Sequence, residues 1–456
     1  MASMYRLPVE VDSEPVADGN FHFISIRNPE EGKDRRTRRR ARSYAVKQAL
    51  ENKRKSQKES MNHFQVSSSE DYARRFASRS TRTQTLVSLP YSLSVGTLDP
   101  FQTLAVDSSR LQALLGNDKA RQASEPVFSV ANELAYHSFH AVFQSGLDDP
   151  ALVNAVMLTF AFAATEGIID RECLGYQSQA MGCISERMSS LDRATSAPTM
   201  GAILLLAGVE ARLGMQSHVQ LHMIAIRRLL DICRTEGIYI AGGIKRAIFW
   251  QDLNSSVMTG SRRVVSHTTF AELQWRRDPF SPSFFRLPPG FRALSHLLTN
   301  DFIEVLEDIH ALQCIRECAH FAGRDVLSMA YINNHQASIQ SRLVDLVGLS
   351  SVLECCRLAA YLCSSMLCCK VWCALVIPSH ISLQLLRKLQ QASDDLLWND
   401  HPDLLLWLLY IGGSFAPKGV IRSDYVELLR RNHAWLKHFY DAFLLHAKVF
   451  WEETLI

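Results

Sequence analysis

The sequence predicts an all-α protein, an irregular multi-helix array that follows a disordered basic N-terminal arm. From Phe128 onward, apolar residues recur every three or four positions, and few stretches alternate as a half-buried strand would. No repeat of fixed period links these helical stretches, so an irregular array is expected instead of a solenoid. A dense basic cluster between Lys33 and Lys58 marks the arm.

The stretch from Gly243 to Arg263 is predicted to form the central helix of this array, with a basic exit. Gly242 and Gly243 precede it, and Gly260 stands where a left-handed residue commonly ends a helix. Its apolar residues are spaced mostly by three and four, which predicts one buried stripe made of Ile244, Ile248, Trp250, Leu253, Val257 and Met258.

Four segments follow one another along the chain. Residues 1–20 form an acidic leader with little to bury, so we expect them to be disordered. Residues 21–59 form the basic arm, and residues 60–95, rich in Ser, Thr and Arg, are expected to be a linker. The helical body is expected over 96–456, which is longer than the roughly 250 to 300 residues at which a single core stops growing.

Turn signals divide the body into helices. The signals are Asp148-Asp-Pro150, Gly214, Gly237 and a Pro-rich loop from Asp278 to Gly290. Together with the apolar spacing they predict helices at 127–145, 150–166, 171–191, 198–213, 217–235, 243–259, 301–320, 337–348, 351–376, 381–398, 402–411 and 423–451.

Composition bounds the class of protein. All eleven cysteines lie after residue 172 without an even framework, which is typical of reduced thiols in an intracellular protein. The first residues hold no apolar core of a secretory signal. The most membrane-like span, Leu358 to Pro378, is interrupted by Lys370, so we expect a buried core helix there and no membrane contact.

Charge is distributed unevenly along the chain. Between Lys33 and Lys58 twelve Lys and Arg residues stand against two acidic residues, a net charge of +10, whereas the whole chain carries +3. The remainder is therefore mildly acidic, at −7. A basic segment of this density attracts polyanions, and each phosphate that it neutralises makes binding depend on salt.

The basic residues fall into two clusters about ten residues apart, which is the form of a bipartite nuclear import signal. We expect an import receptor as a partner and phosphate contacts with DNA as a further role. Import needs fewer assumptions, because nothing in the sequence shows a scaffold that would hold a recognition helix in a groove. A solvated tail without a specific partner is the alternative. The residues concerned are Arg35, Arg36, Arg38, Arg39, Arg40, Arg42, Lys53, Arg54 and Lys55.

Candidate metal ligands are few. His218 and His222 stand one helical turn apart, but Val219 occupies the place of the Glu that a metalloprotease helix requires. The set Cys314, Cys318 and His320 contains no closely paired cysteines and has no obvious fourth ligand. Two partly exposed histidines and core cysteines are therefore expected, with no metal and no cofactor.

Catalytic motifs are also missing. The glycines between Gly237 and Gly243 follow a predicted helix and lack the Lys of a phosphate-binding loop, so they predict a turn between helices. The sequence contains no GxSxG or GxGxxG, and an enzyme is not expected. The tryptophans of the C-terminal helices, at helical spacing, are expected in the core: Trp398, Trp407, Trp435 and Trp451.

Several segments, in order, resemble the fungal-specific transcription factor family, in particular its helical regulatory domain. The resemblance begins at Gly96-Thr-Leu-Asp-Pro-Phe101 and covers about 350 residues. It continues through Ala211-Arg-Leu-Gly214, His222-Met, Ile226-Arg-Arg-Leu229, Ile244-Lys-Arg-Ala-Ile-Phe-Trp250 with Asp252-Leu253, Leu287-Pro-Pro-Gly-Phe291 and Leu404-Leu-Leu-Trp-Leu-Leu-Tyr-Ile-Gly-Gly413. Phe23-Ile and Arg42-Ser-Tyr-Ala-Val-Lys47 resemble members that lack the zinc module.

The resemblance implies an all-α regulatory domain, nuclear residence and control of transcription, with pathway-specific control as a family-level expectation. One departure bears on mechanism, since the binuclear zinc cluster needs six cysteines and residues 1 to 172 contain none. We therefore expect a nuclear regulator whose helical body binds other regulators or a small metabolite, and which can form a homodimer. The alternative is a nuclear helical scaffold or co-regulator that does not contact DNA directly.

Overall fold

The computed structural model describes residues 104–121, 123, 148–278, 280–317, 326–366, 376–393 and 395–432. The chain divides into two units, Met1–Ser92 and Leu93–Ile456, and every described residue lies in the second. The acidic leader, the basic arm, the linker and the predicted helix at 127–145 lie outside the described residues. Within them the chain forms α-helices and short 3-10 helices without a strand, which confirms the all-α class.

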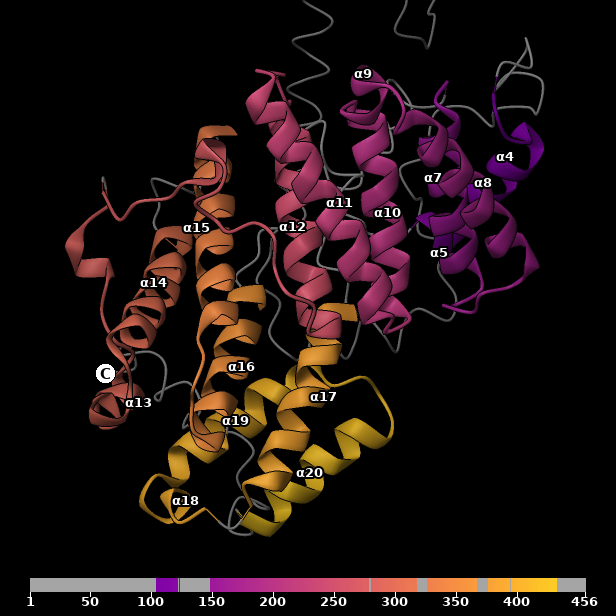
Figure 1. Cartoon of the computed structure of the whole chain (residues 1–456). Helices are drawn as coiled ribbons and strands as arrows, with labels where there is room; N and C mark the ends of the chain where they lie inside the picture. The colour runs from indigo at the N-terminus through magenta and orange to yellow at the C-terminus, as the bar shows by residue number, and fades with distance from the viewer. Residues whose placement is uncertain are drawn as a thin grey trace, which may run out of the picture. The chain divides into compact units, whose positions relative to one another are not determined.

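The first part of the body is built from helices that surround one apolar core. In Figure 1 they occupy the indigo to magenta half of the array. Two of them, α7 and α10, are buried almost throughout because neighbours cover them on several sides. The helices are α4 (Ser108–Gly116), α5 (Asp118–Arg121), α7 (Pro150–Ala164), α8 (Arg171–Arg187), α9 (Leu191–Ala194), α10 (Ala197–Arg212) and α11 (Gln216–Thr235).

Side-chain caps explain where three of these helices begin. Asp149 accepts a hydrogen bond from the backbone N–H of Leu152 at 2.9 Å, with Pro150 in the first turn of α7. Asp170 caps α8 in the same way at 2.8 Å, and Ser196 caps α10. Such side chains satisfy N–H groups that have no partner within the helix, so the sequence itself fixes these helix starts.

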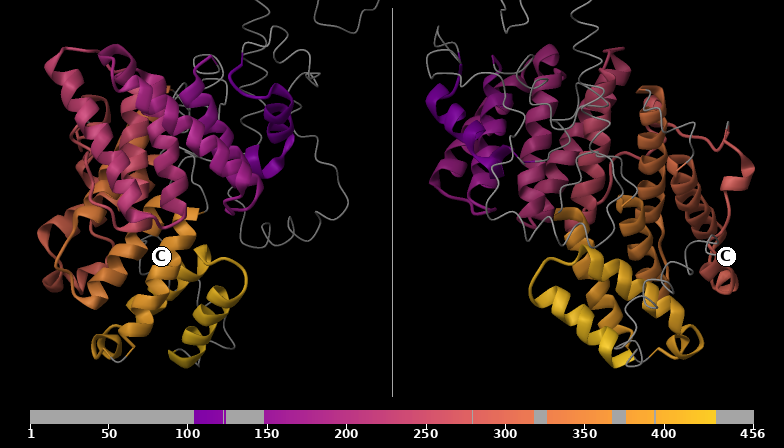
Figure 2. Two further views of the ribbon diagram at one scale, coloured as in Figure 1. Left: turned by 45° about the vertical axis from the view of Figure 1, so that its right-hand side comes forward. Right: turned by 180° about the vertical axis from the view of Figure 1, so that it is seen from behind.

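The central helix α12 (Gly242–Thr259) lies between α10 and α11 on one side and α15 (Val326–Asp345) on the other (Figures 1 and 2). This confirms its place in the middle of the array. Gly260 ends the helix with φ +70°, so the left-handed cap is also confirmed. The prediction of one buried stripe is wrong, because α12 has neighbours on several sides and also buries Phe249, Gln251, Asp252 and Ser255.

The chain between α12 and α14 (Asn300–Glu317) is a loop that contains short helical turns. It includes the predicted Pro-rich segment, in which α13 (Pro289–Arg292) places Phe291 against Trp407 with ring centroids 5.4 Å apart, edge to face. The 3-10 turns are η3 (Ala271–Leu273), η4 (Pro282–Phe284) and η5 (Ser295–Leu297).

A second apolar core lies among the helices that follow. Trp398 and Trp407 are buried in it, as predicted, and Trp435 and Trp451 lie outside the described residues. Gly412 lets the buried Tyr425 approach, because a Cβ there would stand 2.6 Å from the tyrosine ring. The helices are α14, α15, α16 (Ser351–Met366), α17 (Val376–Gln391), α18 (Leu397–Asp400), α19 (Pro402–Phe415) and α20 (Val420–Asn432).

Several boundaries differ from the predicted ones. Helix α15 begins at Val326 and not at 337, and the short α4 and α5 had no strong apolar spacing to indicate them. The predicted helix at 381–398 is α17, which begins at Val376, followed by the separate α18. In the membrane-like span, α16 is buried from Leu358 to Ser365 and ends at the exposed Met366, and residues 367–375 lie outside the described ranges. None of the helices in the described ranges has the length and apolarity needed to cross a bilayer.

Candidate functional site

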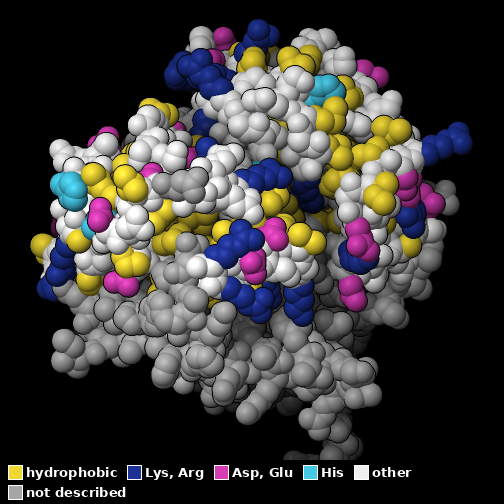
Figure 3. Space-filling view, turned by 90° about the horizontal axis from the view of Figure 1, so that it is seen from below, with side chains coloured by type: hydrophobic (Ala, Val, Ile, Leu, Met, Phe, Trp, Pro, Cys, Tyr) yellow, Lys and Arg dark blue, Asp and Glu magenta, His cyan; other side chains and the backbone are white. Residues whose placement is uncertain are grey.

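The basic residues that the sequence nominates all lie between Arg35 and Lys55, outside the described residues, so their role stays a prediction. The described body shows a different charge pattern. In Figure 3 basic and acidic side chains are interspersed with hydrophobic ones on the face seen from below. The structure instead brings together buried polar side chains of α12, α15 and the loop between α12 and α14, which we call the polar seam.

Asp252, on α12, is the first member of the polar seam. It is 1% exposed, and its carboxylate accepts hydrogen bonds from the backbone N–H groups of Val264 at 3.1 Å and Val265 at 3.2 Å. Gly260 makes this possible, because its left-handed turn sends the chain back along the helix that it has just left. Asp252 thereby holds Val264 and Val265, which follow α12, against the middle of the helix.

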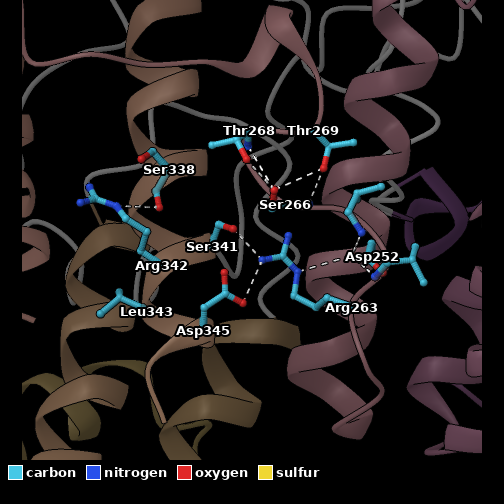
Figure 4. A network of polar contacts seen from close by, with 12 residues as sticks. Asp252, Arg263, Ser266, Thr268, Thr269, Ser338, Ser341, Arg342, Leu343 and Asp345 are labelled. Atoms are coloured by element: carbon cyan, nitrogen blue, oxygen red, sulfur yellow. Dashed lines mark hydrogen bonds and ion pairs between the residues drawn. The ribbon is translucent and has the colours of Figure 1, made fainter. Parts of the chain in front are cut away.

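The charge of Asp252 is partly offset by Arg263. Burial raises the pKa of the Asp252 carboxyl to about 6, while the Arg263 guanidinium and the two backbone N–H groups oppose that rise. The Arg263 Nε lies 3.4 Å from the carboxylate, and its side chain is 10% exposed (Figure 4). A buried carboxylate that depends on one buried cation is sensitive to loss of that cation.

Arg263 also connects the two cores. Its Nη1 donates to the hydroxyl of Ser341 at 2.6 Å and lies 3.8 Å from a carboxylate oxygen of Asp345, and both residues are on α15 (Figure 4). The guanidinium lies over the ring of Phe249, 5.4 Å from its centroid. A single side chain therefore links α12 to α15.

Between Ile332 and Ser341, helix α15 buries more polar side chains than apolar ones. From Ile332 to Ser341 only Ile332, Ala337 and Ile339 of the buried residues are apolar. The Nε2 of Gln340 donates to the hydroxyls of Ser364 and Ser365 on α16, at 3.1 and 3.3 Å. The buried polar residues are Asn333, His335, Gln336, Ser338, Gln340 and Ser341.

Half-buried Asn334 joins α15 to two further elements. Its Oδ1 accepts from Arg246 of α12 at 3.1 Å, and its Nδ2 donates to the carbonyl of Glu272 in η3 at 2.9 Å. Because buried polar groups are costly without partners, this distribution makes α15 the polar connection among α12, α16 and the loop.

A second ionic cluster lies where α15 meets α14. Asp308 is fully buried, accepts from the Nε of Arg277 at 2.9 Å, and pairs with Arg342 of α15. Burial raises the pKa of Asp308, and the two arginines oppose the rise. Arg277 also donates to Glu307 at 3.1 Å, so the cluster ties the loop to α14 and α15.

An aromatic pair closes the polar seam on this side. The ring of Trp275 stacks on that of His335, with centroids 3.6 Å apart and planes at 7°. Burial lowers the pKa of His335 well below its usual value, and Arg342 and Arg277 act in the same direction. His267, in the loop, has its pKa lowered to about 4 by burial and by Arg342 and Arg263. Both imidazoles are therefore neutral near pH 7.

Buried side-chain atoms that have no hydrogen-bond partner within the protein concentrate in the polar seam. Two are obligatory donors, the Nη2 of Arg263 and the Nε1 of Trp275. Such atoms can bind water or the acceptor groups of a small polar molecule. The polar seam holds four further atoms of this kind, which are Gln251 Oε1, His267 Nδ1, Asn333 Oδ1 and His335 Nε2.

The histidines of α11 meet a buried acid instead of standing alone. His222 Nε2 lies 3.0 Å and His218 Nδ1 lies 3.6 Å from the carboxylate of Glu210 on α10, whose side chain is 3% exposed. Gln177 donates to the same carboxylate at 3.2 Å. Among the described residues no group of His, Cys, Asp or Glu has the arrangement to hold a metal ion.

Other predicted motifs are structural where they are described. Gly237, with φ +67°, lies in the turn that connects α11 to α12, as expected, whereas Gly242 and Gly243 are the first two residues of α12 and do not precede it. Cys314 lies 3.7 Å from the Nδ1 of His310, whereas Cys318 and His320 lie outside the described ranges. The described cysteines are free thiols, and burial raises the pKa of several, including Cys173 to about 11.

Sequence reasoning missed the polar seam. The sequence predicts a basic exit made of Arg262 and Arg263, but Arg263 turns inward and only Arg262 is exposed. A usable signal was present, since a lone Asp in the middle of the central helix and an Arg just beyond its Gly cap are typical of a helix exit tied back to the helix. Nothing comparable marks the buried polar residues of α15.

The comparisons with known proteins add no relative. No family model matches the chain, and no curated protein and no solved structure matches it.

Proposed function

We propose that the protein is a nuclear transcription regulator of the fungal-specific transcription factor family, with control of one pathway as its task and without enzymatic activity. The observation that carries this proposal is the net charge of +10 between Lys33 and Lys58 in a chain whose remainder is acidic. The ordered resemblance of the helical body supports it. The basic segment serves nuclear import and contacts DNA phosphates.

The helical body is the regulatory part in this proposal, working through other transcription regulators, homodimer formation and a small effector. The polar seam is the proposed effector site. The Nη2 of Arg263 and the Nε1 of Trp275 are buried donors without a partner in the protein, which favours a small molecule rich in acceptors, such as a carboxylate. Because the seam joins the two cores, an effector there would bias how α12 and α15 pack.

A second candidate is a nuclear scaffold or co-regulator that does not contact DNA. The lack of cysteine before residue 173 favours it, because the six-cysteine zinc cluster cannot form there. The two candidates share import and differ in whether the basic segment touches DNA.

Import is tested with a fluorescent fusion of the full chain in fungal cells. Replacing the nine nominated basic residues between Arg35 and Lys55 by Gln should leave the protein in the cytoplasm. A matched control replaces the exposed Arg276, Arg292 and Arg430 by Gln and should remain nuclear. Nuclear accumulation of the variant with the nine Gln substitutions would contradict the import role.

DNA contact is tested by measuring affinity for duplex DNA over a range of salt concentrations. The full chain should lose affinity as salt rises, with a slope of about −0.9 for each phosphate neutralised. The full chain with the nine Gln substitutions should bind DNA weakly, and its affinity should depend much less on salt. A salt-insensitive complex, or no complex, would contradict DNA contact and favour the scaffold.

The effector site is tested by thermal shift with a panel of small carboxylates and other polar metabolites. The substitution Trp275→Phe removes one donor that has no partner in the protein and keeps an aromatic ring beside His335. The loss of part of the stacked ring should lower the unliganded melting temperature of the variant, so each protein is compared with its own unliganded value. A compound that raises the melting temperature of the natural chain and not of Trp275→Phe would identify the effector. Equal shifts in both proteins would exclude the polar seam as its site.

A further inference from the structure

The loop between α12 and α14 contains a Ser-Pro pair that has no counterpart in the chain. The whole sequence holds one Ser-Pro pair, Ser281-Pro282, and no Thr-Pro pair. Both residues are exposed, and η4 begins at Pro282. In Figure 1 the loop lies at the edge of the described array, beside α14. An enzyme can therefore reach the Ser281 hydroxyl without unfolding a helix.

The backbone of Ser281 is extended, with φ −60° and ψ 129°. Proline favours this conformation in the residue before it, because its ring disfavours the helical region there. Proline also has no backbone N–H, so an enzyme pocket that binds Pro282 needs no acceptor for one. Any other residue in such a pocket would bury an N–H without a partner. Ser281 is thereby distinguished chemically from every other serine of the chain.

We propose that Ser281 is phosphorylated by a Ser/Thr kinase that requires proline after the acceptor residue. The Ser281 Oγ attacks the γ-phosphorus of Mg²⁺-bound ATP, the bond from that phosphorus to the β,γ-bridging oxygen breaks, and ADP leaves. The hydroxyl proton passes to the catalytic carboxylate of the kinase. The Oγ gives up only local contacts, with the hydroxyl of Ser283 at 2.8 Å and its backbone N–H at 3.4 Å. This modification does not depend on the transcription role.

Ser281 lies halfway along a turn whose two ends meet. The Arg277 guanidinium lies over the ring of Phe285, 4.8 Å from its centroid. The backbone N–H of Phe280 donates to the carbonyl of Arg277 at 2.9 Å. Arg277 stands four residues before Ser281 and Phe285 four residues after it. The turn therefore brings a phosphate on Ser281 within reach of Arg277.

Arg277 is the cation for which the phosphate competes. Its side chain is 36% exposed and pairs with Asp308 at 2.9 Å and Glu307 at 3.1 Å, both on α14. A phosphoserine carries about −1.5 to −2 charges at pH 7, so it attracts the guanidinium and repels Glu307. Asp308 keeps Arg342 as a partner, so its buried carboxylate is not left unpaired when Arg277 moves. Phosphorylation therefore loosens the loop from α14.

The site is tested on the purified full chain with ATP, Mg²⁺ and a mitogen-activated protein kinase, which selects Ser-Pro. Mass spectrometry should find one phosphoryl group, on Ser281. Ser281→Ala should remove it, and Pro282→Ala should lower kcat/KM by roughly tenfold or more. Ser283→Ala, at the next exposed serine, is the matched control and should be modified as the natural chain is. Phosphate on another residue, or none, would overturn the proposal.

Access to Ser281 in the folded protein is tested against a synthetic peptide of residues 276–286. Because Ser281 is exposed and extended, kcat/KM for the full chain should lie within about tenfold of that for the peptide. A lower value would mean that the fold hides the serine from the kinase, which would overturn the site.

The loosening of the loop is tested by hydrogen exchange. The phosphorylated chain is compared with Ser281→Ala taken through the same kinase treatment. The amides of Phe280, Phe284 and Phe285, which donate within the turn, should exchange faster by roughly tenfold in the phosphorylated chain. Exchange in α10 is the internal control and should not change. Equal or slower exchange in the turn would contradict the competition for Arg277.

Discussion

The helices α10 and α15 are both buried along much of their length, yet they offer opposite surfaces to their neighbours. From Thr199 to Ala211 every residue of α10 is buried, and only Thr199 and Glu210 are polar. Between Ile332 and Ser341, α15 buries six polar side chains. Apolar contacts stabilise without direction, whereas hydrogen bonds and ion pairs demand one arrangement. Helix α10 therefore contributes mainly stability through apolar packing, whereas α15 specifies how the two cores pack against each other.

The meeting of the cores shows the same division. Val344 of α15 packs against both apolar clusters, and Val257 of α12 packs against the second, but the polar seam adds hydrogen bonds and ion pairs between the same elements. Buried polar contacts add less net stability than apolar burial of similar size, because both partners give up water. A connection of this kind suits a boundary whose packing an effector can bias.

The largest effect is expected in α10. Replacing Leu205 by Ala removes a fully buried side chain and leaves a cavity, which should lower the free energy of unfolding by about 4 kcal/mol. Urea denaturation measures the loss. The exposed Leu221→Ala on α11 is the control and should cost far less. Equal losses at both positions would mean that α10 is not the apolar centre of the first core.

The next effect concerns the polar seam. Arg263→Met leaves the carboxylate of Asp252 buried without its cation, which should lower the free energy of unfolding by about 3 kcal/mol. Adding Asp252→Asn removes the uncompensated charge, so the double variant should be more stable than Arg263→Met alone. A double-mutant cycle in urea measures the coupling. Strictly additive losses would show that the pair is not coupled.

A smaller effect follows from the neutral histidine of α15. Burial lowers the pKa of His335, so as the pH falls below about 6.5 the unfolded chain binds a proton that the folded chain excludes. The natural chain should lose stability relative to His335→Gln by up to about 1.4 kcal/mol per pH unit. Parallel urea titrations from pH 7 to pH 5 measure the difference. A constant difference would contradict the buried neutral imidazole.

The smallest effect is expected at Ser341. Ser341→Ala removes the hydroxyl that accepts from Arg263 at 2.6 Å, while Asp252 and Asp345 remain near the guanidinium. The free energy of unfolding should fall by about 1 kcal/mol, measured by urea denaturation. A loss as large as that of Leu205→Ala would erase the distinction between the two helices.

The sequence predicted the helices whose apolar spacing is regular, and the Gly260 cap at the end of the central helix. It did not predict the first eleven residues of α15, because the polar residues from Asn333 to Gln336 separate the short apolar run Val326–Ile332 from the apolar spacing that resumes at Ala337. It also assigned α12 a single stripe, because neighbours from both cores cannot be inferred from the spacing of one segment.

The candidate site was even less accessible from the sequence. Asp252 and Arg263 were both in view, but their contact depends on a chain reversal at Gly260 and on α15, which follows more than sixty residues later. Glu210 escaped notice for a related reason, since its partners His218 and His222 lie on the next helix. Contacts between helices depend on how the helices pack in three dimensions, and the spacing of residues within one segment does not predict that packing.

Chromatin occupancy tests the proposed function most directly. The full chain is compared with the variant in which the nine basic residues between Arg35 and Lys55 are neutralised and an independent import signal is added. The account predicts discrete sites for the full chain and their loss in the variant. Sites that the variant retains would mean that the helical body is recruited through partners without DNA contact. A full chain that occupies no sites would contradict the role in transcription.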